Sequence, residues 1–210
     1  MGVNLELNAL QKEVTRQRIL EAGFRIFAEK SIDKVTMNDV AEAAGIGVAT
    51  VYRYYSNKTL LALGVSGWAW EKYVEDAIKN DDAPHETAAQ RFEFFLETFL
   101  DLYRNHKDLL RFNQFYNIFV GQEMTRGEAI KPYETVVKLI LDQFRQIYAQ
   151  AQVDHTLRTD VSMQEMLFSS LHLMLAAITR YAVGLVYEGG QDPERELVLL
   201  KNMLLKQYQA

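Results

Sequence analysis

The sequence predicts an all-α fold of about nine helices, and two observations support this prediction. First, only three prolines and eleven glycines interrupt the 210 residues. The long segments between them are rich in Ala, Leu, Glu, Lys, Gln and Arg, which favour helices over strands. Second, hydrophobic residues, 49% of the chain, recur at the three- and four-residue spacing that gives each helix an apolar face to bury.

Turn and capping residues separate the helical segments and set their expected ends. Thr36 and Asp39 predict a capping box at the start of the second helix, and Gly45 can adopt the left-handed backbone that ends it. Gly189 and Gly190 are expected to end the eighth helix. The expected helices cover residues 10–30, 37–44, 48–54, 58–80, 86–106, 107–120, 131–152, 162–188 and 193–209.

Composition excludes several classes of protein and site. The chain has no cysteine, which rules out disulfides and thiolate sites and fits a reducing cytoplasm. Its four histidines are scattered, so we expect no enzyme, no metal and no cofactor. The N-terminus lacks the apolar stretch of a signal peptide. No apolar segment is both long enough and sufficiently free of charged and polar residues to span a bilayer. We therefore expect a soluble, cytoplasmic protein that does not bind membranes.

Charge is distributed unevenly along the chain. The net charge is −5, but residues 1–60 hold eight Lys or Arg against seven Asp or Glu. No acidic residue occurs between Glu42 and Glu71. A surface that meets phosphates must exclude carboxylates locally, so this segment is a candidate for contact with nucleic acid.

The functional signal lies in residues 36–58, TMNDVAEAAGIGVATVYRYYSNK. Two short helices joined by a glycine-centred turn are the geometry of a helix-turn-helix, whose second helix enters the major groove of DNA. Small groups on that second helix suit thymine methyls, and Arg53 can reach a guanine edge or a phosphate. The expected internal core of the motif consists of Val40, Ala41, Ala44, Ile46 and Val51.

This segment resembles the TetR family of transcriptional regulators over about residues 16–62. The resemblance implies a helix-turn-helix DNA-binding domain over residues 1–57 and a helical ligand-sensing and dimerisation domain over residues 58–210. The matching residues are Ile19, Leu20, Ala22, Phe27, Thr36, Ala41, Ala44, Gly45, Thr50, Val51, Tyr52, Tyr54, Tyr55 and Lys58.

The resemblance also assigns DNA contacts to individual positions. Thr36 and Lys58 would hold phosphates, and residues of the second motif helix would meet the backbone and the bases. Two positions depart from the family pattern: Ser31 replaces the usual glycine after the first helix, and Gly47 replaces a capping Ser or Thr. The candidate DNA-binding residues are Thr36, Gly47, Val48, Ala49, Thr50, Tyr52, Arg53, Tyr54 and Lys58.

Aromatic and methionine side chains are dense in the expected second domain. At helical spacing such residues more often form a core than line a pocket. These residues are nevertheless numerous enough to line a cavity for a flat or apolar ligand. The resemblance places such a cavity between the fourth and eighth helices. His172 would be either its polar anchor or a hydrogen-bonded core histidine. The candidate pocket residues are Phe95, Phe99, Tyr103, Phe112, Phe115, Tyr116, Phe119, Met166 and His172.

The last two expected helices carry apolar and small residues suited to close helix packing. Two copies of them would form a four-helix dimer interface, and the alternative is that they pack within one subunit. A homodimer also suits DNA half-sites about 34 Å apart. The candidate interface residues are Ala177, Gly184, Leu197, Leu200 and Leu204.

Together these features predict a ligand-responsive regulator of transcription. The expected form is a homodimeric repressor that a small apolar or aromatic effector releases from a palindromic operator in double-stranded DNA. The alternative is an architectural or partner-regulated DNA-binding factor without a small-molecule ligand, which a closed core would favour.

Overall fold

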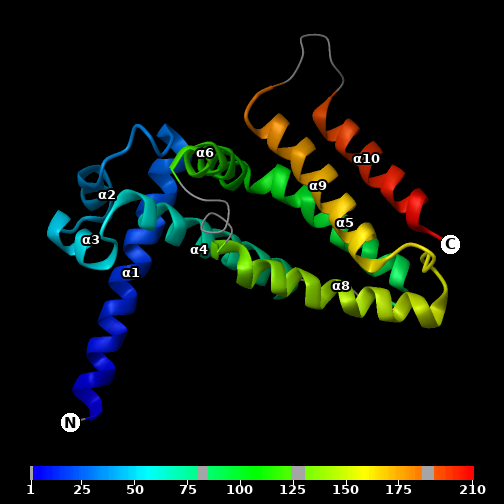
Figure 1. Ribbon diagram of the computed structural model, residues 1–210, viewed down its shortest axis with the longest axis horizontal. Helices are drawn as coiled ribbons and strands as arrows, with labels where there is room; N and C mark the ends of the chain where they lie inside the picture. The colour runs from blue at the N-terminus through cyan, green and yellow to red at the C-terminus, as the bar shows by residue number, and fades with distance from the viewer. Residues whose placement is uncertain (1, 80–84, 124–130, 186–191) are drawn as a thin grey trace. The chain divides into compact units, whose positions relative to one another are not determined.

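The computed structural model describes residues 2–79, 85–123, 131–185 and 192–210 (Figure 1). Within these ranges the chain forms nine α-helices, a 3-10 turn and no strand, which confirms the all-α prediction. None of the described helices is long and apolar enough to cross a membrane. The elements are α1 (Gly2–Lys30), α2 (Met37–Ala44), α3 (Val48–Tyr54), α4 (Lys58–Lys79), α5 (Ala88–Asn105), α6 (Lys107–Glu123), η1 (Lys131–Tyr133), α8 (Glu134–Asp154), α9 (Met163–Ala182) and α10 (Pro193–Tyr208).

Two helix ends differ clearly from expectation. Helix α1 begins at Gly2, eight residues before the expected start, because no proline or glycine lies between Gly2 and Leu10 to stop it. Helix α9 ends at Ala182 rather than near residue 188, since Gly184 adopts a left-handed φ of 79°. Gly189 and Gly190, which we expected to end this helix, lie outside the described residues.

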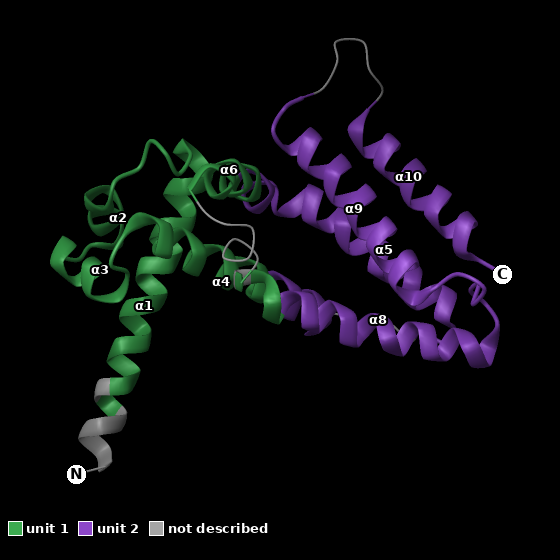
Figure 2. Ribbon diagram, viewed as in Figure 1, with its two compact units in different colours: residues 1–72, 112–135 green, residues 73–111, 136–210 purple. Residues whose placement is uncertain are grey.

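The chain divides into two compact units (Figure 2). The first comprises residues 1–72 and 112–135, and the second comprises residues 73–111 and 136–210. Packing thus adds most of α4 and α6 to the helices of the expected N-terminal domain. The Phe112 ring of α6 is fully buried, with its centroid 5.5 Å from that of Phe24 and 6.5 Å from that of Phe27 on α1.

A buried polar cluster joins α4, α6 and η1 inside the first unit. The Ser66 hydroxyl donates to the Tyr133 hydroxyl over 3.1 Å, and the Trp70 indole donates to Oδ1 of Asn113 over 3.3 Å. Burial raises the pKa of Tyr133 to about 12, so its hydroxyl stays protonated at neutral pH. The cluster therefore satisfies polar groups that would otherwise be costly to bury.

In the second unit, α5 lies at the centre of an aromatic core. The fully buried Phe92 ring meets Phe144 of α8 edge to face at 5.9 Å and Tyr208 of α10 at 5.8 Å. Helix α5 also packs against α9, and α9 packs against α10. This unit therefore has an apolar core of its own.

Ser31, where the family pattern has glycine, adopts a left-handed backbone with φ of 67°. We expect Ser31→Gly to raise the free energy of unfolding by about 0.5–1 kcal/mol, because glycine takes this conformation without steric cost. Urea denaturation measures the change. The control is Ser31→Ala, which keeps the strain; an equal gain in both variants would contradict this explanation.

Candidate nucleic-acid interface

Helices α2 and α3 form the expected helix-turn-helix. The Thr36 hydroxyl accepts from the amide of Asp39 over 3.2 Å, and an Asp39 carboxylate oxygen accepts from the amide of Thr36 over 2.7 Å. Gly45 ends α2 with φ of 63°, and Gly47 caps α3 through its backbone alone. The capping box and the glycine stop predicted from the sequence are both confirmed.

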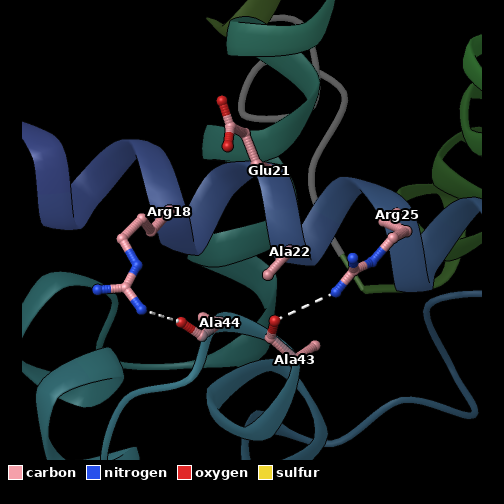
Figure 3. Close-up of a pocket in the computed structure, with 6 residues that line it drawn as sticks. All are labelled: Arg18, Glu21, Ala22, Arg25, Ala43 and Ala44. Carbon is pink, nitrogen blue, oxygen red and sulfur yellow. Dashed lines mark hydrogen bonds between the residues drawn. The ribbon is translucent and has the colours of Figure 1, made fainter.

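Helix α1 holds the end of α2 through two arginines (Figure 3). Arg18 donates to the carbonyl oxygen of Ala44 over 2.8 Å, and Arg25 donates to that of Ala43 over 3.1 Å. Guanidinium groups are well suited to this position, because the last carbonyls of a helix carry partial negative charge. Neither arginine contact could be predicted from the sequence, since the backbone carbonyls that accept these hydrogen bonds leave no pattern in a sequence.

Helix α3 turns one apolar residue inward and leaves the others accessible. Val51 is fully buried, whereas Tyr52 and Arg53 are exposed. Most of the expected motif core is likewise buried, and Ile46 is half-buried. The remaining candidate contact residues of α3 and its cap are exposed or half-buried: Gly47, Val48, Ala49, Thr50 and Tyr54. The helix therefore presents an accessible face without a carboxylate, as a recognition helix requires.

The C-terminal end of α3 is held by two tyrosines. The Tyr54 hydroxyl donates to the backbone carbonyl of Lys12 on α1 over 3.1 Å. Tyr55 lies against Gly64 of α4 and near Arg16, and burial raises the pKa of its hydroxyl. These contacts fix the direction of α3 relative to α1 and α4 within the first unit.

The contact between Tyr55 and Gly64 predicts an effect on stability. A methyl group on Gly64 would lie 2.7 Å from Cε1 of Tyr55, closer than two carbon atoms can approach. We expect Gly64→Ala to lower the free energy of unfolding by about 1–2 kcal/mol. The matched variant is Gly121→Ala on α6, where the new methyl meets nothing within 4 Å; it should gain about 0.5–1 kcal/mol from helix propensity. If denaturation curves show that both substitutions change the free energy of unfolding in the same direction, the tight contact between Tyr55 and Gly64 is refuted.

The ammonium group of Lys58 donates hydrogen bonds to backbone carbonyls of the same unit. Its three protons are directed at the carbonyl oxygens of Ile32, Asp33 and Val35, at 2.9, 3.2 and 3.1 Å. The ammonium also lies 5.7 Å from the centroid of the Phe119 ring. Lys58 thus ties the loop between α1 and α2 to α4, and a phosphate would have to compete with these partners. The phosphate contact implied by the resemblance stays a prediction.

Thr36 is exposed, but its hydroxyl is already engaged. It donates to an Asp39 carboxylate oxygen over 2.7 Å, and the backbone and side-chain hydrogen bonds from Thr36 lower the pKa of Asp39. The hydroxyl can still accept, and the exposed N-terminal end of α2 remains available to an anion. Its contact with phosphate also stays a prediction.

Four of the nine candidate pocket residues belong to the first unit. Phe112, Tyr116 and Phe119 are buried there, and Phe115 is half-buried. Phe112 packs on the rings of α1, and Phe119 lies under the ammonium of Lys58. The three buried rings therefore belong to the core of the first unit.

The other five candidates belong to the second unit. Phe95 and Phe99 meet edge to face at 5.3 Å, and Met166 is fully buried. Tyr103 is half-buried, with the ammonium of Lys107 4.5 Å from its ring centroid. His172 is exposed and stacks on Phe168 at 6.0 Å, so it is not a core histidine, and its role as a polar anchor for a ligand stays a prediction.

The candidate dimer-interface residues differ in how far their side chains are exposed. Leu197 is fully buried and Leu204 is 7% exposed inside the subunit, so neither offers side-chain surface to a partner. Ala177 and Leu200 are half-buried, and the exposed Gly184 lies in the turn after α9. The exposed apolar face of these helices consists of residues that the sequence analysis did not select: Leu173, Leu199 and Met203.

The structure also brings together residues that the sequence analysis did not connect. A groove of about 650 Å³ separates α1 from the end of α3, and it is lined by Gln11, Lys12, Thr15, Arg53 and Tyr54. Helical periodicity shows that Lys12 and Thr15 share a region of α1 but not that α3 ends beside them.

Comparison with known proteins supports this assignment of the fold. The sequence profile of "Bacterial regulatory proteins, tetR family" matches residues 19–65. An uncharacterized HTH-type transcriptional regulator of Mycobacterium tuberculosis is 38% identical over 55 residues, which are 26% of this chain and 27% of that relative. The match thus spans about a quarter of the relative's length.

Solved structures share the fold over nearly the whole chain. A TetR transcription regulator from Haloarcula marismortui aligns over 94% of this chain and 100% of its own, with 16% identity and a TM-score of 0.75. The transcriptional regulator FadR from Bacillus subtilis, in complex with stearoyl-CoA, aligns over 90% of this chain and 97% of its own, with 15% identity and a TM-score of 0.71. Residues 19–65 thus match the N-terminal segment of the TetR family of bacterial regulatory proteins, and the solved structures share the fold of the chain.

Proposed function

We propose that this protein is a DNA-binding regulator of transcription that acts as a homodimeric repressor. The observation that carries the proposal is the accessible face of α3, where Tyr52 and Arg53 are exposed and no carboxylate occurs from residue 43 to residue 70. Helices α1 and α4 hold this face firmly, so a recognition helix would meet DNA in a preformed orientation.

A second copy of the chain is the proposed partner of α9 and α10. These helices pack against each other, and each leaves apolar side chains in solvent: Leu173 and Ala176 on α9, and Leu199 and Met203 on α10. Members of each pair are three or four residues apart and share a face. Two copies would bury these side chains in a four-helix interface and present two recognition helices to a palindromic operator.

The proposed effector is a small apolar or aromatic molecule that binds in the second unit. The aromatic rings around α5 supply apolar surface, and two α9 hydroxyls, Oγ of Ser170 and Oγ1 of Thr179, are buried without a hydrogen-bond partner among the described residues. A ligand with a polar group would satisfy such a hydroxyl, which otherwise costs free energy. The complex of Bacillus subtilis FadR with stearoyl-CoA supports an apolar ligand for this fold.

Binding of the intact chain to labelled duplex DNA from upstream of its own gene tests the proposed function. Fluorescence anisotropy at rising salt should show an affinity that falls steeply, with a slope of about −0.9 for each phosphate contacted. An unlabelled duplex of unrelated sequence should compete poorly. Absence of binding at low salt, or an affinity that does not change with salt concentration, would contradict the proposal.

A further inference from the structure

The groove between the start of α1 and the end of α3 carries an inference that rests on the proposed function. Its volume is about 650 Å³, and its lining comes from two helices that are far apart in sequence. Gln11, Lys12 and Thr15 lie on the part of α1 that precedes the matched family segment, and Arg53 and Tyr54 lie on the last turn of α3. The hydrogen bond from Tyr54 to the Lys12 carbonyl holds the two walls together.

The chemistry of this groove suits a phosphate. Lys12 and Arg53 are exposed cations, and neither has an ion-pair partner among the described side chains. Gln11 adds an amide donor, whereas the Thr15 hydroxyl already donates to the Gln11 carbonyl over 2.8 Å. No carboxylate lines the groove; the nearby Glu13 instead contacts Arg16 and Gln17. Two cations and an amide thus face one cavity without an opposing acid.

The position of the groove beside α3 indicates which phosphate it would meet. A recognition helix in the major groove, about 12 Å wide, lies between two walls of backbone phosphates. A cation next to the end of that helix therefore faces the backbone phosphates at one edge of the major groove, while exposed α3 side chains face the bases. We infer that the groove between α1 and α3 binds a DNA backbone phosphate through Lys12 and Arg53, which makes the start of α1 a second DNA-contacting element.

Lys12→Ala tests this inference on the full-length chain. The probe is a 30-base-pair duplex of random sequence, and its affinity is measured by fluorescence anisotropy over a range of salt concentrations. Loss of one phosphate contact should lower the affinity by about five- to tenfold at low salt and make the salt slope shallower by about 0.9. Lys138→Ala, which removes an exposed lysine from α8, is the matched control and should change neither quantity.

Two further measurements separate the inference from the proposed function. Lys12→Arg keeps the cation and should restore both affinity and slope, and circular dichroism should show unchanged helix content in every variant. If Lys12→Ala binds like the unaltered chain while Arg53→Ala binds weakly, the α1 contact is refuted and the recognition helix is retained. If the unaltered chain does not bind duplex DNA at all, the proposed function itself fails.

Discussion

Replacing Arg53 by glutamate should lower the affinity for duplex DNA by about 100-fold while the helices remain folded. Arg53 is exposed on the last turn of α3 and lines the groove beside Lys12. The substitution removes a cation that faces phosphates or base edges, and it also places a carboxylate on a surface that otherwise has none. Both changes act in the same direction, because DNA repels a negative charge held against its backbone.

The control for Arg53→Glu is Lys138→Glu on α8, which changes the net charge by the same amount on the second unit. Anisotropy titrations at one fixed salt concentration compare the two variants. An equal loss in both would mean that total charge, rather than the α3 surface, determines binding. A loss confined to Arg53→Glu supports α3 as the DNA-contacting helix.

Replacing Lys58 by methionine should lower the free energy of unfolding by about 2–3 kcal/mol. The Lys58 ammonium satisfies three carbonyl oxygens of the loop between α1 and α2, and two of these hydrogen bonds, to Ile32 and Val35, are partly buried. Methionine keeps the length and apolar stem of the side chain but leaves these oxygens without the charged donor. Hydrogen bonds from charged groups contribute more than neutral ones, so the loss is large for one side chain.

Lys34→Met is the control, since Lys34 is exposed in the same loop and should change stability by less than about 0.5 kcal/mol. Urea denaturation followed by circular dichroism gives both values. If Lys58→Met is as stable as the unaltered chain but loses DNA affinity, the lysine acts as a phosphate clamp and the structural role described above is wrong.

Local signals account for what the sequence predicted correctly. The capping box of Thr36 and Asp39 and the left-handed Gly45 depend on residues within a few positions of each other, so their pattern is visible in the chain. The acid-free stretch that includes α3 is likewise a property of consecutive residues. These features located the helix-turn-helix and both ends of α2.

The partners of individual side chains could not be predicted, because they are distant in sequence. The carbonyls that Lys58 contacts lie 23 to 26 residues earlier. The aromatic residues of α6 recur at helical spacing whether they line a cavity or meet α1, and the structure places Phe112 in contact with α1. Helical periodicity indicates which face of a helix is apolar, but it does not indicate which other helix packs against that face.

Helix α10 shows the same limit for the candidate dimer face. Leu197 and Leu204 form one apolar stripe and Leu199 and Met203 form another, and only the second is exposed. A helix with two apolar faces gives no local sign of which one its own subunit covers. The choice depends on how α5 and α9 pack against α10.

Selection of binding sites from a random duplex library, followed by hydroxyl-radical footprinting of the intact chain, tests most directly whether paired α3 helices read DNA. Paired α3 helices should give two protected patches on one side of the duplex, related by two-fold symmetry, with centres about 10 base pairs or a multiple of that apart. The Arg53→Glu chain should leave the same duplex unprotected. A single asymmetric patch, or protection that Arg53→Glu does not alter, would contradict the account.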